Sequence, residues 1–277
     1  MKVQPQLPVI REIECKSVLS KSKISDYTVN CYTGCLHACV YCYARYMKRF
    51  TEHSEPWGKF ADVKVNAPQI LEKQLKRAAP GRVIMSSVCD GWQPLEREYE
   101  VSRRCLNLLL HYGFHVTILT KSSLVRSDLD ILEGADAELG MTLTTMDDAL
   151  CEKIEPGASL TSDRIDTLRE AADRGIKIWV FMGPFMPFLS DSEDNINAIF
   201  AALSELKLEH IYADKLNPRP GVWRSIKAFL GENYPYLIGS YGRILYEKSQ
   251  REAYSQGLKK LMKQCAGKYG REEDLRI

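Results

Sequence analysis

The chain has 277 residues, of which 45% are hydrophobic and 27% charged, and its formal net charge is +2. This composition is ordinary for a globular protein, and it excludes intrinsic disorder and a small fold held together by disulfides. The longest apolar run, residues 178–189, is short and broken by one glycine and two prolines, so the sequence predicts no membrane span. The N-terminus lacks the apolar stretch of a signal peptide, so we expect a cytoplasmic protein with no membrane partner.

Apolar, β-branched segments recur along the first three quarters of the chain, separated by amphipathic helical patterns. Strands are predicted at residues 28–33, 82–88, 114–120, 137–144, 176–182 and 209–213. Six strand–helix units predict an α/β fold with a parallel sheet. Because six units are fewer than the eight of a closed barrel, we expect a partial (βα)6 TIM-like barrel, with a doubly wound sheet as the alternative.

The helical patterns have recognisable ends. The first begins at Pro68 with Asn66 as its N-cap, and the second follows an apolar stripe from Val101 to a C-terminal Gly113. The later helices begin after Ser127, at Thr161 and near Ile196.

A proline- and glycine-rich stretch at residues 217–221 interrupts this alternation. We therefore divide the chain into an N-terminal segment (1–26), a core (27–215) and a mostly helical C-terminal extension (216–277). The extension is basic and contains interleaved tyrosines, which makes nucleic acid a candidate partner. The alternative is the solvated face of an amphipathic helix. The basic residues concerned are Arg243, Lys248, Arg251, Lys259, Lys260, Lys263, Lys268 and Arg271.

The chain has nine cysteines, and four of them lie within residues 31–42, where an even spread would place fewer than one. Clustered thiols in a reducing compartment indicate a metal site rather than disulfides. The spacing Cys35-x3-Cys39-x2-Cys42 allows three thiolates to bind one four-iron cluster, which leaves one iron free for another ligand. A structural zinc site needs four ligands, and Cys31 or His37 would have to supply the fourth. The spacing favours iron–sulfur and leaves zinc open.

The string from Asn30 to Arg45, NCYTGCLHACVYCYAR, resembles the signature of the radical S-adenosylmethionine (SAM) superfamily, with an aromatic residue directly before the third cysteine. It is most similar to the spore photoproduct lyase-like branch, also called DNA repair photolyase-like. The similarity continues in the same order along the predicted strands, at residues 90–98, 120–122, 142–145 and 154–157.

This resemblance implies a partial barrel that holds a 4Fe-4S cluster on Cys35, Cys39 and Cys42. In such enzymes the open iron binds SAM, which is cleaved by reduction to methionine and a 5′-deoxyadenosyl radical that abstracts hydrogen from a substrate. An external electron donor of the flavodoxin or ferredoxin type is then required. The substrate is not identified, and nucleic acid is one candidate. A different class remains open, a zinc-bearing nucleic-acid-binding protein that uses Cys31, Cys35, Cys39 and Cys42.

Polar residues follow the second to fourth predicted strands, where ligands bind in parallel α/β folds. By resemblance, Ser86, Ser87 and Asp90 face the ammonium group of SAM, although Asp-Gly is also a common turn. Lys121 would face the SAM carboxylate, or be a solvated lysine at a strand end. Thr142 and Thr144 share a strand face and are candidates for the ribose, although threonine also simply favours strands.

Tyr41 and Tyr43 flank Cys42. The resemblance implies that Tyr41 packs near adenine and that both relay a hydrogen atom, whereas ring packing over the cluster is the alternative. Cys89 is a candidate hydrogen donor, but it is two residues out of step with the donor cysteine of the lyases, whose place is taken by Ser87. Alternation along a strand would still put Ser87 and Cys89 on one face.

Overall fold

The computed structural model describes residues 7–277, so the first six residues of the predicted N-terminal segment lie outside it. The fold is mixed α/β, built on an eight-stranded sheet with the order β11-β10-β9-β8-β7-β6-β3-β2. Six parallel strands are neighbours in chain order, and they confirm the six predicted ones. They are β3 (Tyr27–Val29), β6 (Arg82–Met85), β7 (His115–Thr120), β8 (Ala137–Leu143), β9 (Lys177–Phe185) and β10 (Leu208–Lys215). Because the strand order never reverses among them, the doubly wound alternative is wrong.

Short strands at both edges of the sheet were not predicted. Strand β2 (Leu19–Lys21) runs antiparallel to β3, and β11 (Leu275–Arg276) runs parallel to β10. Within the described residues β2 and β11 do not pair with each other, so the sheet is open at both edges.

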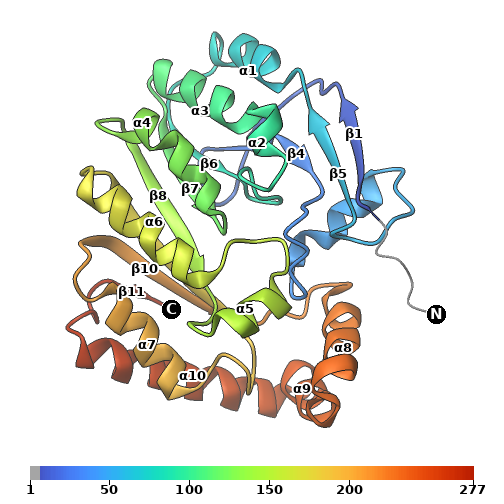
Figure 1. Cartoon of the computed structure of the whole chain (residues 1–277), viewed down its shortest axis with the longest axis vertical. Coiled ribbons are helices and arrows are strands. Elements are labelled where there is room, and N and C mark those ends of the chain that lie inside the picture. The colour runs from blue at the N-terminus through green and yellow to red at the C-terminus, as the bar shows by residue number, and fades with distance from the viewer. Residues whose placement is uncertain (1–6) are drawn as a thin grey trace.

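A second, three-stranded sheet lies beside the first, with the order β1-β5-β4 (Figure 1). It contains β1 (Val9–Ile13), β5 (Phe60–Lys64) and β4 (Tyr32–Thr33). The strand predicted at 28–33 is therefore two strands, one in each sheet. The chain therefore passes from one sheet to the other just before Cys35.

The connections between the parallel strands are helical, as predicted. They contain α1 (Ala67–Leu75), α2 (Glu96–Tyr99), α3 (Val101–His111), α4 (Leu129–Leu132), α5 (Asp148–Ile154), α6 (Thr161–Asp173) and α7 (Glu193–Leu203). Gly113 and Gly175 have positive φ angles of 74° and 72° just after α3 and α6, in keeping with C-terminal caps. Asn66 is the N-cap residue of α1, as predicted, but its side chain makes no capping bond and instead accepts from the Cys15 N–H at 2.8 Å.

The two faces of the large sheet differ in burial. In β7, Val116 and Ile118 are fully buried under the helices, whereas Thr117 and Leu119 on the other face are partly exposed. Thr142 and Phe181 lie in the neighbouring strands β8 and β9 and, with Leu119, line a cavity on this second face. The sheet therefore has one face for the core and one for a site.

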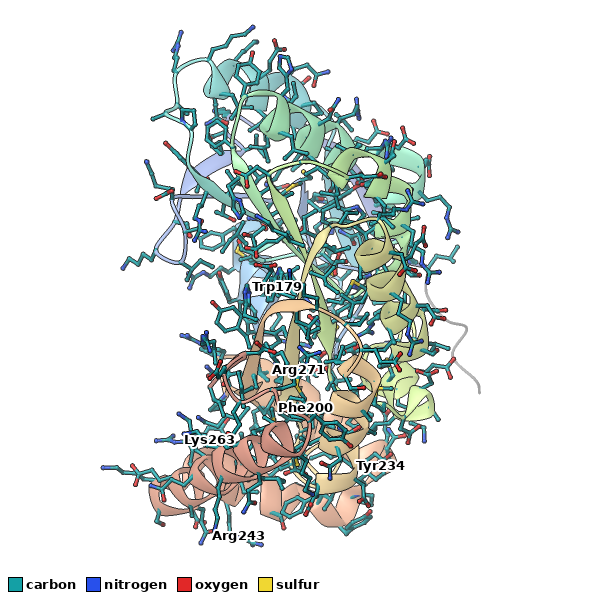
Figure 2. All side chains as sticks on the ribbon, turned by 90° about the vertical axis from the view of Figure 1, so that its left-hand side faces the viewer. Trp179, Phe200, Tyr234, Arg243, Lys263 and Arg271 are labelled. Atoms are coloured by element: carbon teal, nitrogen blue, oxygen red, sulfur yellow. The ribbon has the colours of Figure 1, made fainter. Side chains whose placement is uncertain are left out.

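The C-terminal extension is helical, as predicted, with α8 (Val222–Asn233), the 3₁₀ helix η3 (Pro235–Leu237), α9 (Ile238–Tyr246) and α10 (Lys248–Lys268). Helix α10 buries Leu258, Met262 and Cys265 and packs along α7. Some of its basic residues have partners within the chain, since Lys268 pairs with Glu193 at 2.6 Å. Others, such as Lys263, point outward (Figure 2). Among the described residues, none of the helices is both long and apolar enough to cross a membrane.

The guanidinium of Arg271 joins the C-terminal segment to the end of α7. It donates to the carbonyl oxygens of Leu203 and Ser204, at 3.0 and 2.9 Å, and to that of Leu206. Arg271→Ala leaves these acceptors without their donor and should lower the free energy of unfolding by about 2 kcal/mol. Urea denaturation measures the loss, and Lys263→Ala, an exposed site on α10, should change stability little. Equal stability of the two variants would contradict this role for Arg271.

Candidate active site

A cavity of about 120 Å³ opens beyond the ends of β6, β7 and β8. The structure brings most of the sequence-predicted site residues to its wall. They are Cys35, Cys39, Cys42, Tyr43, Ser86, Ser87, Cys89, Asp90, Lys121 and Thr142. Ser87 and Cys89 share the cavity, but not through strand alternation, because β6 ends at Met85 and Val88 lines the cavity as well.

The cysteine loop runs from β4 to the 3₁₀ helix η1 (Tyr43–Phe50) and is held by backbone contacts. The Ala38 N–H donates to the Cys35 carbonyl at 3.4 Å, and Ala38 has a positive φ of 54°. The Arg45 guanidinium donates to the carbonyl oxygens of Cys39 and Cys42, at 3.1 and 3.0 Å. These contacts fold the loop so that all three thiols line the cavity.

The three thiols are free, and burial raises the pKa of each above its ordinary value. They are therefore protonated in the ligand-free chain, and a metal must displace their protons to bind. Within residues 7–277 no three Cys, His, Asp or Glu side chains converge closely enough to hold a single metal ion. The three thiols line the wall of the same cavity.

Cys31 does not join the other three cysteines. Its buried thiol lies against the thiol of Cys105, and this contact, together with burial, raises its pKa well above the ordinary value. It lines neither the 120 Å³ cavity nor the larger one beside it. The four-cysteine zinc site is therefore not formed, because its fourth ligand faces the protein core.

A buried network anchors the cysteine loop to α5 and α6. Glu155, which follows α5, pairs with Arg164 of α6, and both side chains are fully buried. The Tyr41 hydroxyl donates to Glu155, and the Thr144 hydroxyl donates to the same carboxylate at 2.9 Å. Arg164 also donates to the Thr142 carbonyl at 2.9 Å. Tyr41 and Thr144 are thus occupied by this network, and Thr144 lies outside both cavities.

Backbone contacts support the same junction. The Val40 N–H donates to the Ile154 carbonyl at 2.9 Å, and the Gly157 N–H donates to the His37 carbonyl at 3.0 Å. A Cβ at Gly157 would lie 2.0 Å from the carbonyl oxygen of Leu36, so only glycine permits this close approach.

The loop after β6 is organised by Asn30 and Asp90. Asn30 accepts from the Val88 N–H at 3.0 Å and lies 3.7 Å from the Cys89 sulfur, which donates to it. Asp90 accepts from the Thr120 hydroxyl at 2.7 Å and from the Lys121 N–H at 2.9 Å. Asp90 therefore ties this loop to the end of β7, as well as lining the cavity. Burial raises the pKa of Cys89 to about 12, so it is a thiol at neutral pH.

His37 is 1% exposed and lines the cavity. Burial lowers its pKa to about 4, so the imidazole is neutral. Its Nδ1 lies 3.4 Å from Asp90, and its buried Nε2 has no hydrogen-bond partner within the described chain. A buried polar atom without a partner beside three thiols fits a site that holds a polar group when loaded.

A larger cavity of about 360 Å³ adjoins the first and shares Cys39, Cys42, Tyr43 and Lys121 with it. Tyr41 lines this larger cavity, and the Lys121 ammonium lies 5.9 Å from the centre of its ring. The far wall contains groups that the sequence did not single out, Lys215 and Arg219 among them. Glu155 and Asn30 lie within the strings that resemble the family, but the sequence alone predicts no role for them. Arg164 carried no signal, because burial of an ion pair is not visible in sequence.

A model of the radical SAM superfamily matches residues 29–197. An uncharacterized protein of Methanocaldococcus jannaschii is 33% identical over 232 residues, covering 82% of this chain and 84% of the relative. The chain belongs to the radical SAM superfamily. An uncharacterized protein of Mycobacterium tuberculosis is 27% identical to this radical SAM protein over 251 residues, covering 86% of the chain and 73% of the relative.

Among solved structures, spore photoproduct lyase complexed with dinucleoside spore photoproduct has a TM-score of 0.72 at 15% identity, covering 95% of this radical SAM chain and 80% of that chain. A variant of that lyase with bound AdoMet and dinucleoside spore photoproduct has a TM-score of 0.71 at 15% identity, with the same coverage. At 15% identity, this similarity establishes that the chain and the lyase share a fold, and nothing further.

The Glu155–Arg164 pair gives a testable consequence. Arg164→Met leaves a buried carboxylate without its partner and should lower the free energy of unfolding by about 3–5 kcal/mol. Adding Glu155→Gln removes that charge, so the double variant should recover part of the loss. Urea denaturation of the single and double variants measures both effects. A double variant no more stable than Arg164→Met would contradict the account of the pair.

Proposed function

We propose that this protein is a radical SAM enzyme that binds a 4Fe-4S cluster on Cys35, Cys39 and Cys42 and cleaves SAM reductively. The observation that carries the proposal is the cavity into which these three thiols, but not Cys31, project. When bound, the cluster and SAM supply a 5′-deoxyadenosyl radical that abstracts hydrogen from a substrate. We further propose that the large sheet is a partial (βα)6 barrel, with the cavity at its C-terminal edge.

The chain's own residues would bind and orient SAM beside the cluster. Lys121 brings a positive charge to both cavities and suits a carboxylate. Ser86, Ser87 and Thr142 offer polar groups on the same wall. Asp90 is a weaker candidate for direct contact with SAM, because its carboxylate already accepts three hydrogen bonds. We propose instead that Asp90 positions Lys121, from whose backbone N–H it accepts. Thr144 would act only through Tyr41 and Glu155.

The substrate would enter through the larger cavity, where Tyr43 is half exposed. Lys215 and Arg219 on the far wall favour an anionic substrate, and nucleic acid is the class we propose. The outward basic residues of α9 and α10 would extend this contact, while an external flavodoxin- or ferredoxin-type protein supplies electrons.

Cys89, whose thiol donates to Asn30, would serve as the hydrogen donor, and Tyr43 would relay the hydrogen atom. We propose cytoplasmic localisation, where thiols remain reduced.

The first test is the metal and the cleavage reaction. Protein purified anaerobically should be brown, contain about four irons per chain, and form 5′-deoxyadenosine and methionine when reduced with SAM. Cys35→Ala, Cys39→Ala and Cys42→Ala should each lose the iron, because each removes a ligand. Cys31→Ala is the matched control and should retain it. Colourless protein with one zinc, or equal metal loss in Cys31→Ala, would overturn the proposal.

The role of Lys121 has its own test. Lys121→Met keeps the length of the side chain and removes its charge, so SAM binding to the cluster-loaded protein should weaken by about 10- to 100-fold. Equilibrium dialysis of SAM against cluster-loaded protein measures this change, with Lys263→Met as the control for a charge far from the cavity. Unchanged SAM affinity in Lys121→Met would remove Lys121 from the binding site.

A further inference from the structure

A further cavity, of about 200 Å³, lies on the outer side of the cysteine loop. Leu36 and Ala38 of the loop line this outer cavity. Their neighbours Cys35, His37 and Cys39 line the 120 Å³ cavity on the inner side. Burial alternates in the same way, because positions 35, 37 and 39 are buried whereas 36 and 38 are partly exposed. The loop is therefore a wall one chain thick between the candidate active site and the outer cavity.

Two glycines support this wall from outside without covering it. A Cβ at Gly157 would lie 2.0 Å from the carbonyl oxygen of Leu36. Gly58 has a φ of 90°, and a Cβ there would lie 2.5 Å from the Cβ of Ala38. Both segments therefore approach the loop with their backbones, and neither places a side chain over it. Exposed prolines, Pro8 and Pro156, form part of the remaining wall, so the outer cavity opens at the surface.

The outer cavity combines an apolar lining with a positive charge. Lys59 is exposed, and it is the one charged residue among the described residues that line this cavity. The other lining residues are apolar or glycine. Proteins that exchange electrons meet through small, transient interfaces, and opposite charges at the rim speed their encounter. An electron carrier with an acidic surface fits this combination.

The position of the outer cavity indicates the same kind of partner. The inner side of the loop is unsuitable for an electron donor, because SAM would occupy the 120 Å³ cavity before it is cleaved. Electron transfer between proteins weakens steeply with distance, so a donor must approach the cysteines closely from another side. In the outer cavity it would contact Leu36 and Ala38, which are joined directly to Cys35 and Cys39.

We propose that a reduced one-electron carrier with an acidic surface, of the flavodoxin or ferredoxin type, docks on the outer cavity and passes its electron across the cysteine loop. The carrier is oxidised by one electron and the cluster is reduced by one, so no further reactant is needed. The docking site rests on the proposed function, because it requires a cluster on the inner side of the loop. Lys59 is a positioning residue, which orients the carrier and does not touch SAM.

The decisive comparison reverses one charge at two places. Lys59→Glu changes the outer cavity, whereas Lys263→Glu changes an outward-pointing residue of α10, away from β1 and β5 (Figures 1 and 2). With cluster-loaded, SAM-bound protein and flavodoxin hydroquinone as the probe, stopped-flow absorbance measures the rate at which flavin semiquinone appears. The second-order rate constant should fall about tenfold in Lys59→Glu and stay unchanged in Lys263→Glu. The difference should shrink as salt is added.

Dithionite provides the control for the cluster itself. It is small and needs no docking surface, so it should support equal SAM cleavage in both variants and in the unmodified chain. A lower yield with dithionite in Lys59→Glu would contradict the assignment of Lys59 to docking, because it would show damage to the active site.

A second measurement uses the unmodified sequence. Carbodiimide joins a lysine amine to a carboxylate in contact with it, with loss of water, and mass spectrometry identifies the coupled residues. In the complex with flavodoxin, Lys59 should be coupled to a flavodoxin carboxylate. Equal flavodoxin rates in Lys59→Glu and the unmodified chain, zero included, or coupling confined to other lysines, would overturn the docking site alone. Absence of a cluster, or of SAM cleavage with dithionite, in the unmodified chain would overturn the proposed function as well.

Discussion

The geometry of the site depends on a buried ion pair between Glu155 and Arg164, because this pair fixes where the cysteine loop lies. The loop has little regular structure of its own, and its contacts reach the region after β8 through Tyr41, Val40 and His37. Arg164 holds Glu155 in place and also donates to the carbonyl oxygen of Thr142, near the end of β8. Two buried charges are tolerated here because each is paired and the surrounding hydrogen bonds satisfy their remaining atoms.

The large sheet contributes residues both to the protein core and to the site. Alternate residues of β7 and β8 face either the helices or the cavity, so a single strand contributes to the core and to the site. At the strand ends, Asn30 and Asp90 hold the loop that carries Ser87 and Cys89 against the cysteine loop. The thiols, the polar cavity wall and Lys121 are thereby brought together before any cofactor binds, which is the preorganisation that radical chemistry in a sheltered site requires.

Much of this could be predicted from the sequence. Apolar, β-branched runs and helical periodicity identified the six parallel strands and most of their helices, and cysteine spacing identified the loop whose three thiols line the cavity. Strands β1, β2 and β5 escaped prediction, because β2 has only three residues and because β1 and β5 pair with each other although they lie far apart in the sequence. Asn66 is at the predicted N-cap position, but its side chain bonds the distant Cys15 backbone instead of the helix, which one sequence does not reveal.

Within the site, the sequence could place residues at strand ends but not say which neighbours they would meet. Thr144 lies just past the end of β8 and donates its hydroxyl to the buried Glu155 carboxylate, so it does not line the cavity with Thr142. Cys31 lay within the cysteine cluster in sequence, and its thiol turned to Cys105 instead. Arg164 lies outside the recognised strings, and its importance comes from burial and from contacts with residues distant in sequence, which one sequence does not reveal.

We infer that three cysteines bind a four-iron cluster and leave one iron open to SAM. Mössbauer spectroscopy of the ⁵⁷Fe-loaded protein, recorded with and without SAM, tests it directly. We predict that SAM changes the signal of one iron in four and leaves the other three nearly unaltered, since only one iron lacks a cysteine ligand. Four irons that all remain unchanged on addition of SAM, or a spectrum from a single isolated iron, would contradict the account.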